Sequence, residues 1–190
     1  MILGITGGSG AGKTTLLQGL RQRGFLVLDC DQIYHELLET DQALLEAIEN
    51  RFPGTVEAGR LQRKKLGAQV FADPAALADL NAITHGAIRR EVERRLLPEN
   101  NAAIDAIALF ESGLNALCDV TVAVVAPEED RVRRLMAREG ITEAYARSRI
   151  AAQPKEDWYR QRCDHIIENS GDLQQFQEEC LAFFAQTGIM

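Results

Sequence analysis

One short stretch near the start of the chain restricts the possible folds more than any other feature. Residues 7–14 read GGSGAGKT and satisfy the pattern G-x-x-x-x-G-K-[ST]. A short apolar run, residues 2–6, precedes the stretch, and an amphipathic run, residues 13–23, follows it. The sequence therefore predicts a strand, a loop and a helix in that order. This is the structural context that the pattern requires in order to act as a phosphate-binding loop.

The residue types in this loop indicate how it would hold a nucleotide. Glycines let backbone N–H groups turn inward around a phosphate, and the following helix directs its positive N-terminus at the same anion. We expect Lys13 to reach the β- and γ-phosphates and to act in catalysis, and the Thr14 hydroxyl to ligate Mg²⁺. ATP with Mg²⁺ is the expected ligand, since no Asn-Lys-x-Asp motif favours GTP. The residues expected to bind it here are Gly8, Ser9, Gly10, Ala11, Gly12, Lys13, Thr14 and Thr15.

Further apolar runs predict the rest of a sheet. Each is too short for a helix, and helical patterns separate nearly all of them, which indicates βαβ units and mainly parallel strands. The expected fold is therefore an α/β, three-layer fold of the P-loop nucleotide-hydrolase type. The predicted strands after the first are residues 25–28, 106–110, 120–125 and, with a weaker pattern, 164–167.

The long interval from about residue 33 to residue 97 has leucines and isoleucines spaced near 3.6 throughout. It contains a break at Pro53-Gly54 and a helix start at Asp73-Pro74, where Asp caps and Pro takes the first helical position. The interval is too long for one crossover helix. We therefore expect a helical insertion that stands over one end of the sheet, within a single domain covering residues 1–190.

Charge is distributed unevenly along the chain. The net charge is -7, which argues against broad nucleic-acid affinity, yet Arg131 to Arg162 holds nine basic and four acidic residues. The surrounding block, about residues 128–162, is predicted to be helical with interruptions at Gly140 and Pro154 and a cap at Thr142. The sequence leaves open whether this block is a solvated face with salt bridges or a surface that gathers a phosphorylated ligand.

Two carboxylates follow the second predicted strand, at Asp29 and Asp31. Ligands of open parallel sheets lie at the carboxyl ends of the strands, so both side chains are candidates for the site. A carboxylate there could orient an acceptor hydroxyl and take its proton, or hold metal-bound water. From the residues alone, Asp31 could equally be the N-cap of the following helix, while a metal-side or structural role suits Asp29.

The remaining composition indicates a soluble, cytoplasmic protein with no membrane span. The 46% hydrophobic and 26% charged residues exclude a disordered or collagen-like chain. No 18-residue apolar run occurs, and the first residues lack the basic start of a signal peptide. The cysteines show no CxxC pair and no zinc-like spacing to histidine, so reduced thiols are expected at Cys30, Cys118, Cys163 and Cys180.

A short chain with this loop, an early acidic pair and a separate helical block suits a kinase acting on a hydroxyl of a small molecule. Four blocks of sequence carry a closer resemblance. They are residues 4–15, residues 27–31, residues 61–88 with LxRxxL, VFxDP and LNxIxH, and residues 149–153 with 163–171, which read RIAAQ and CDHIIENSG. In these blocks the chain resembles dephospho-coenzyme A kinases, which phosphorylate the ribose 3′-hydroxyl of dephospho-CoA in the last step of coenzyme A synthesis.

The resemblance implies roles for residues outside the phosphate loop. Asp31 would be the catalytic base, and Arg138 and Arg149 would be cations of a lid that meets the nucleotide. Asn169 and Gly171 would lie near the adenine, and the helical insertion would bind the CoA moiety. Arginines in a closing lid neutralise charge on the transferring phosphoryl group and exclude water, which would give the basic block a purpose.

The acceptor itself, dephospho-CoA, carries a diphosphate and a long pantetheine arm. Its recognition needs cations and an extended surface, which Arg63, Lys64 and the helices up to residue 97 could provide. His85 is a second candidate for acceptor contact, although it could equally be a buried histidine at a helix end.

The chain departs from the expected family pattern at two places. Gly86 stands where a proline usually follows the histidine, which would loosen a helix junction there, and Ala108 stands in a segment that usually reads Pro-Leu-Leu. Both changes bear on the acceptor more than on the nucleotide. Uridine kinases share the loop and shikimate kinases share the acidic pair, but residues 61–88 argue against both. A nucleotide-binding regulatory protein without turnover remains an alternative.

Overall fold

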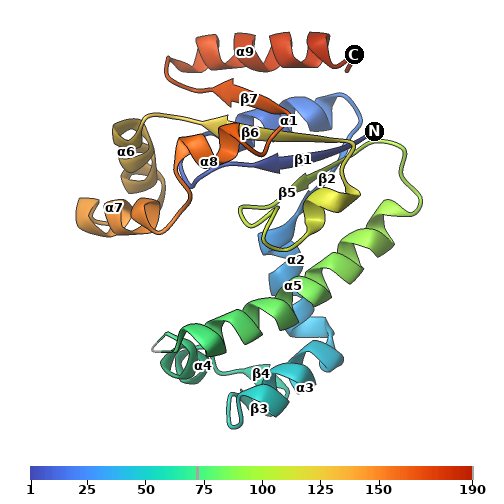
Figure 1. Ribbon diagram of the computed structural model, residues 1–190, viewed down its shortest axis with the longest axis vertical. Coiled ribbons are helices and arrows are strands. Elements are labelled where there is room, and N and C mark those ends of the chain that lie inside the picture. Colours follow the sequence, from blue (N-terminus) through green and yellow to red (C-terminus); the bar gives the residue numbers. More distant parts are fainter. Residues whose placement is uncertain (72, 190) are drawn as a thin grey trace.

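The computed structural model describes residues 1–71 and 73–189. Its centre is a five-stranded sheet in the order β2-β5-β1-β6-β7, and every strand pairing in it is parallel (Figure 1). The predicted α/β fold with a parallel sheet is thereby confirmed. The strands are β1 (Ile2–Thr6), β2 (Leu26–Asp29), β5 (Ala102–Asp105), β6 (Val120–Val125) and β7 (His165–Glu168).

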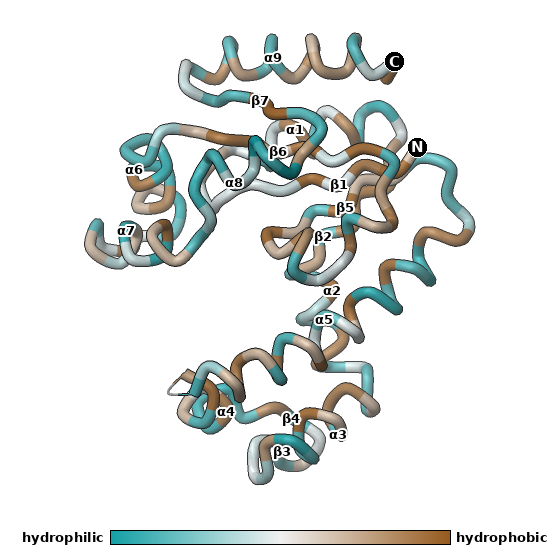
Figure 2. The backbone as a smooth tube through the Cα atoms, viewed as in Figure 1, coloured by the Kyte–Doolittle hydropathy of each residue, from teal (hydrophilic) through white to brown (hydrophobic). Residues whose placement is uncertain are grey.

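Helices cover both faces of this sheet, and the strands alternate between two hydrophobic clusters. Ala103 is buried with α1 (Lys13–Gln22) and α9 (Leu173–Gln186), whereas the next residue, Ile104, is buried with α2 (Cys30–Thr40) and α5 (Pro74–Leu96). This is the period of two expected for a strand buried on both faces. Figure 2 shows teal and brown alternating along α5 and α9, as expected for helices with one buried face.

One predicted strand was misplaced. Residues 107–110 form turns rather than a strand, Ala106 has no regular structure, and the strand of this region is β5, which ends at Asp105. The apolar run continues past the end of the strand because Ala106 and Leu109 are buried against neighbouring helices. The strand predicted at residues 120–125 is found there, and those predicted at 25–28 and 164–167 lie one residue later.

The interval of residues 33–97 extends away from the sheet (Figure 1). The leucine spacing predicted that this interval is helical throughout, and that prediction is wrong. A small antiparallel hairpin interrupts it, turning at Ala58 and Gly59, which both have positive φ. The carboxylate of Glu49 accepts hydrogen bonds from the backbone N–H groups that lead into this hairpin. The elements after α2 are α3 (Gln42–Arg51), β3 (Val56–Glu57), β4 (Arg60–Leu61), α4 (Arg63–Val70) and α5.

The basic block forms a pair of helices, α6 (Glu128–Glu139) and α7 (Glu143–Ala151), followed by α8 (Glu156–Arg160). We call α6 and α7 together the α6–α7 hairpin. Gly140 ends α6 at φ 66°, and the Thr142 side chain accepts from the N–H of Tyr145 at 3.3 Å to cap α7. The structure also has a short 3-10 helix, η1 (Leu114–Leu117). Within residues 1–71 and 73–189, no helix combines the length and apolar character needed to cross a bilayer.

Candidate active site

The phosphate loop connects β1 to α1 and depends on its glycines. Gly10 and Gly12 have φ values of 77° and 110°, which residues with a Cβ rarely adopt. A Cβ at Gly12 would lie 2.2 Å from the amide nitrogen of Asn169, and one at Gly10 would lie 2.7 Å from the carbonyl oxygen of Arg131. The glycines thus provide both the turn and the close approach of neighbouring segments.

The loop opens on a cavity of about 300 Å³ at the carboxyl ends of the strands. Most of the nucleotide-side residues predicted from the sequence come together there. Thr15, Asn169 and Gly171 do not line this cavity. Thr15 lies in a hollow between α1 and α9, Gly171 lines another cavity beside α9, and Asn169 is buried. The walls consist of residues 8–14 together with Asp29, Asp31, Asp105, Ile107, Arg134, Arg138 and Arg149.

Lys13 begins α1 and donates a hydrogen bond from Nζ to the carbonyl oxygen of Gly7 at 2.9 Å. Burial lowers the pKa of Lys13, while the carboxylates of Asp105 and Asp31 oppose that shift. The ammonium group is therefore a desolvated cation inside the cavity. A polyphosphate that enters the cavity would place further negative charge beside this ammonium group and stabilise its charged form.

Asp105 is a site residue that the sequence analysis missed. It ends β5 beside Asp29 of β2, and its Oδ1 is buried with no hydrogen-bond partner among the described residues. Burial raises the pKa of Asp105 to about 6, with Lys13 opposing and Asp29 and Asp31 adding to the shift. A carboxylate at the end of the strand next to β1 would have been the signal, but the misplaced strand at residues 106–110 concealed it.

Asp29 and Asp31 have different positions. The N-cap of α2 is Asp29, whose Oδ1 accepts from the backbone N–H groups of Asp31 and Gln32 at 3.0 Å each. The alternative that Asp31 caps the helix is therefore wrong. Asp31 lies in the exposed first turn of α2, where its carboxylate remains available to a ligand.

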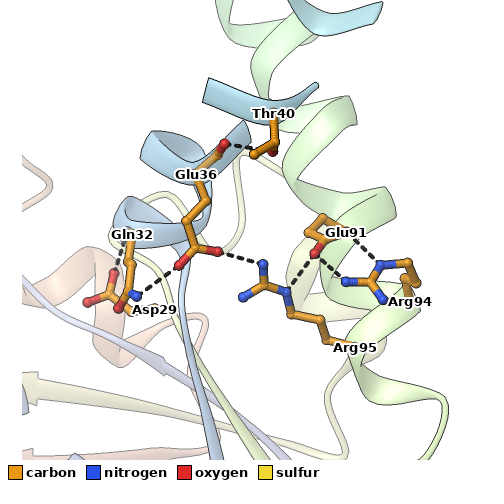
Figure 3. A network of polar contacts seen from close by, with 7 residues as sticks. All are labelled: Asp29, Gln32, Glu36, Thr40, Glu91, Arg94 and Arg95. Carbon is orange, nitrogen blue, oxygen red and sulfur yellow. Dashed lines mark hydrogen bonds and ion pairs between the residues drawn. The ribbon is translucent and has the colours of Figure 1, made fainter. Parts of the chain in front are cut away.

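The helix that carries Asp31, α2, is braced against α5. Glu36 of α2 accepts from Arg95 of α5 at 2.6 Å, and Arg95 also binds Glu91 of its own helix (Figure 3). Hydrogen bonds from Arg94 and Arg95 hold the pKa of Glu91 at about 2. The network joins the two helices that flank the second cavity of the site.

This second cavity, of about 200 Å³, lies on the insertion side of Asp31. His85 lines it, and burial lowers the pKa of His85 while Glu111 opposes the shift. Arg63 does not line it but is exposed on α4, where its Nη2 lies 3.0 Å from Nδ1 of His35. The cavity is lined by Cys30, Asp31, Tyr34, Thr84, His85, Ile88, Ala106, Ile107, Ala108, Ser112 and Leu114.

Arg138 and Arg149 reach the nucleotide cavity from the α6–α7 hairpin. Both pair with the same carboxylate, Glu139, and their hydrogen bonds lower its pKa. Exposed ion pairs of this kind contribute little to stability, at most about 1 kcal/mol. An incoming phosphate could therefore take the two arginines from Glu139 at small cost.

Asn169, predicted to lie near the adenine, is buried against the phosphate loop instead of standing free. Its amide donates to the carbonyl oxygen of Ala11 at 2.8 Å, and its Oδ1 accepts from Arg134 at 3.1 Å. Arg134 is a second wall residue that the sequence analysis did not single out, although it lies in the basic block.

A glycine-rich phosphate loop at the carboxyl ends of parallel strands, with a carboxylate between two cavities and arginines above, defines a P-loop kinase. The comparisons agree with this class and narrow it. The family model for dephospho-CoA kinase matches residues 1–175. The chain belongs to the dephospho-CoA kinase family, and the resemblance found in the sequence is confirmed.

Individual relatives cover nearly the whole chain. The dephospho-CoA kinase of Syntrophotalea carbinolica is 36% identical over 193 residues, which are 98% of this chain and 92% of the relative. A solved Thermus thermophilus structure is 35% identical, with a TM-score of 0.82 over 98% of this chain and 97% of that one. A shikimate kinase from Bacteroides thetaiotaomicron, 16% identical with a TM-score of 0.62 over 99% and 98% of the two chains, shows the shared fold alone.

Proposed function

We propose that this protein transfers the γ-phosphoryl group of ATP to the ribose 3′-hydroxyl of dephospho-CoA, giving coenzyme A and ADP. The observation that carries the proposal is the position of Asp31. Its side chain lines both the phosphate-loop cavity and the cavity on the insertion side. A base at the boundary can take the proton of a hydroxyl on one side as the phosphoryl group arrives from the other.

The nucleotide side of the reaction depends on fixed positive charge. Backbone N–H groups of Gly10 and residues 12–14, at the N-terminus of α1, would hold the β-phosphate, with Lys13 bridging to the γ-phosphate. Arg138 and Arg149 would leave Glu139 and neutralise charge on the transferring group. Asn169, through its bond to Ala11, would keep the loop in shape below the adenine.

A magnesium ion fits this site as part of the nucleotide complex. The described residues contain no group of three or more His, Cys, Asp or Glu side chains that could hold a metal ion by itself. Thr14 is exposed and lines the cavity, and Asp105, a wall residue of the same cavity, has an oxygen with no hydrogen-bond partner among the described residues. When bound to Thr14 and the nucleotide, Mg²⁺ would neutralise phosphate charge.

On the acceptor side, the protein must hold a hydroxyl beside Asp31 and a long charged arm beyond it. The cavity with His85 and Ile88 is mostly apolar at its walls, which suits a ribose or base rather than a diphosphate. The diphosphate needs cations, and Arg63 on α4 is available at the surface of the insertion. The CoA moiety would thus extend from the cavity along the insertion, residues 33–97.

The test measures ADP release with Mg-ATP and each of four acceptors, followed by mass analysis of the product. Dephospho-CoA should gain one phosphoryl group at the 3′-hydroxyl far faster than uridine, adenosine or shikimate react. A Lys13→Ala preparation, expected to lose several powers of ten in kcat, reports the background from contaminating kinases. Preferred phosphorylation of a nucleoside, or no mass shift on dephospho-CoA with ATP bound, would contradict the proposal.

A further inference from the structure

Both ends of the α6–α7 hairpin are fastened to one residue of the phosphate loop, Ser9. Gln153, which follows α7, accepts from the Ser9 N–H at 2.9 Å and donates from Nε2 to the Ser9 hydroxyl at 2.7 Å. Arg131, near the start of α6, donates from Nε to the Ser9 carbonyl oxygen at 3.0 Å. Arg131 also donates to Gln153 Oε1 at 2.6 Å, which joins the two ends to each other.

These contacts engage the N–H, the carbonyl and the hydroxyl of Ser9, which is only 6% exposed. The N–H group of Ser9 donates to Gln153 and is therefore not free to bind a phosphate. The glycines on either side permit the approach of Arg131. A Cβ at Gly8 would lie 2.1 Å from Nη2 of Arg131, and one at Gly10 would lie 2.7 Å from its carbonyl oxygen.

The bonds to Arg131 are made by a cation that has lost much of its water. Burial lowers the pKa of Arg131, with Tyr159 and Glu128 opposing the shift. A buried guanidinium that loses an acceptor carries a desolvation penalty, so removal of Gln153 would also weaken the hold of Arg131. The three side chains therefore form one unit rather than three separate contacts.

We propose that Gln153 and Arg131 are positioning residues, which fix the base of the α6–α7 hairpin on Ser9 and thereby place Arg138 and Arg149 for catalysis. The proposal rests on the proposed function for the part that these two arginines play. Arg138 lies seven residues beyond Arg131 on α6, about 10 Å along the helix. A tilt of about 6° at the base would then move Arg138 by about 1 Å, a misplacement that can lower a rate about 100-fold.

The main test compares Gln153→Ala with Gln161→Ala, an exposed glutamine that follows α8 and has no side-chain hydrogen bond among the described residues. Gln153→Ala should lower kcat at least about tenfold and leave the Kd for ATP within about threefold, because the loop residues that face the phosphates remain. Gln161→Ala should match the parent. An unchanged kcat, or an equal loss in kcat and ATP affinity, would overturn the proposal.

Gln153→Glu provides the rescue. Its carboxylate keeps acceptors for the Ser9 N–H and for Arg131, and the Ser9 hydroxyl can donate to it, so most of the parent kcat should return. If Gln153→Ala does not fold, Gln153→Glu and Ser9→Ala still test the unit. Ser9→Ala removes only the hydroxyl bond and should lower kcat by less than Gln153→Ala; failure of the rescue, or no effect of Ser9→Ala, counts against the proposal.

A second background separates this inference from the proposed function. In a protein that carries both Arg138→Ala and Arg149→Ala, adding Gln153→Ala should lower kcat little further if Gln153 acts through the hairpin arginines, whereas a full additional loss would overturn that route. Amide hydrogen exchange in residues 8–10 and 131–153 gives a readout without turnover. It should accelerate in Gln153→Ala even if Arg138→Ala shows that the arginine has no catalytic part; unchanged exchange would refute the anchor itself.

Discussion

Asp29 accepts a hydrogen bond from the backbone N–H of Asp31 at 3.0 Å, so one carboxylate of the pair caps the helix that carries the other. The backbone explains why Asp29 caps the helix and Asp31 does not. Asp29 is the last residue of β2 and has the extended backbone that an N-cap requires, whereas Asp31 is already inside the first turn. Although the two residues are only two positions apart, we expect substitution of Asp31 to lower activity and substitution of Asp29 to lower stability.

Replacing Asp31 by Asn should lower kcat about 100-fold or more, because the amide keeps the size of the side chain but cannot take a proton. The melting temperature should stay unchanged. Replacing Asp29 by Ala should lower the free energy of unfolding by about 1 kcal/mol through loss of the cap. Kinetics and thermal denaturation of both variants provide the comparison, and an active but unstable Asp31→Asn protein would reverse the assignment.

The parts of this site that could be predicted from the sequence are local in the chain. The phosphate loop lies directly between β1 and α1, and the caps at Asp73 and Thr142 act within three residues of themselves. Asp105 could not be found in this way. The run around it, with alanines at positions 102, 103 and 106, shows no contrast between a strand and a buried turn, so the strand boundary was placed too late.

The contacts that join the hairpin to the loop lie outside the reach of pattern analysis. Ser9 and Gln153 are 144 residues apart in the chain, and neither residue type predicts which residue it will bind. The basic block could be read as a ligand surface, but Arg131, Arg134 and Arg138 have the same residue type and different partners. Only the fold shows that Arg131 binds the loop carbonyl of Ser9, while Arg138 remains at the cavity.

Asp105 should make stability depend on pH. Its native pKa of about 6 exceeds the ordinary value of 3.8, with burial and the carboxylates of Asp29 and Asp31 raising it and Lys13 and Arg21 opposing. The native state therefore binds more protons than the unfolded state between these values, and this carboxyl makes the protein less stable as pH rises through that window. Above about pH 6 the penalty is constant.

Asp105→Asn removes this titration. Relative to the parent, the variant should gain free energy of unfolding between about pH 4 and pH 6, by at most about 3 kcal/mol, and the difference should then level off. Urea unfolding of the nucleotide-free proteins across this range measures it. Two parallel stability profiles would show that Asp105 ionises normally in the native state.

Gly86 lies in the middle of α5, where a glycine lowers the free energy of unfolding relative to an alanine. The helix runs unbroken from Pro74 to Leu96, so the looser junction expected at Gly86 is not found. Apart from its chain neighbours and the backbone of its own helix, a Cβ there would meet one described atom within 4 Å, Nη1 of Arg90 at 3.7 Å. Gly86→Ala should therefore raise the free energy of unfolding by about 0.5–1 kcal/mol.

The matched control for Gly86 is Gly67→Ala in α4, where the new Cβ would lie 3.0 Å from the ring of Phe71. The helix propensity gained is the same, but the contact requires the ring to move, so the net gain should be smaller. Urea denaturation of the two variants beside the parent measures both changes. Equal effects at both positions would mean that the space around Gly86 does not decide the outcome.

Arg63 provides the sharpest separation between acceptor and nucleotide. It lies on α4, outside both cavities of the site, and its one partner among the described side chains is His35. If Arg63 binds the diphosphate of dephospho-CoA, Arg63→Ala should raise the KM for that acceptor between about 10- and 100-fold, the range of a charge-assisted hydrogen bond. The KM for ATP should change less than about twofold.

Lys65→Ala is the control, because Lys65 is an exposed cation of the same helix that already pairs with Glu57. Steady-state kinetics with each substrate varied in turn would decide: an equal rise in both KM values, or the same acceptor effect from Lys65→Ala, would remove Arg63 from the acceptor site and leave Asp31 and His85 as its candidates.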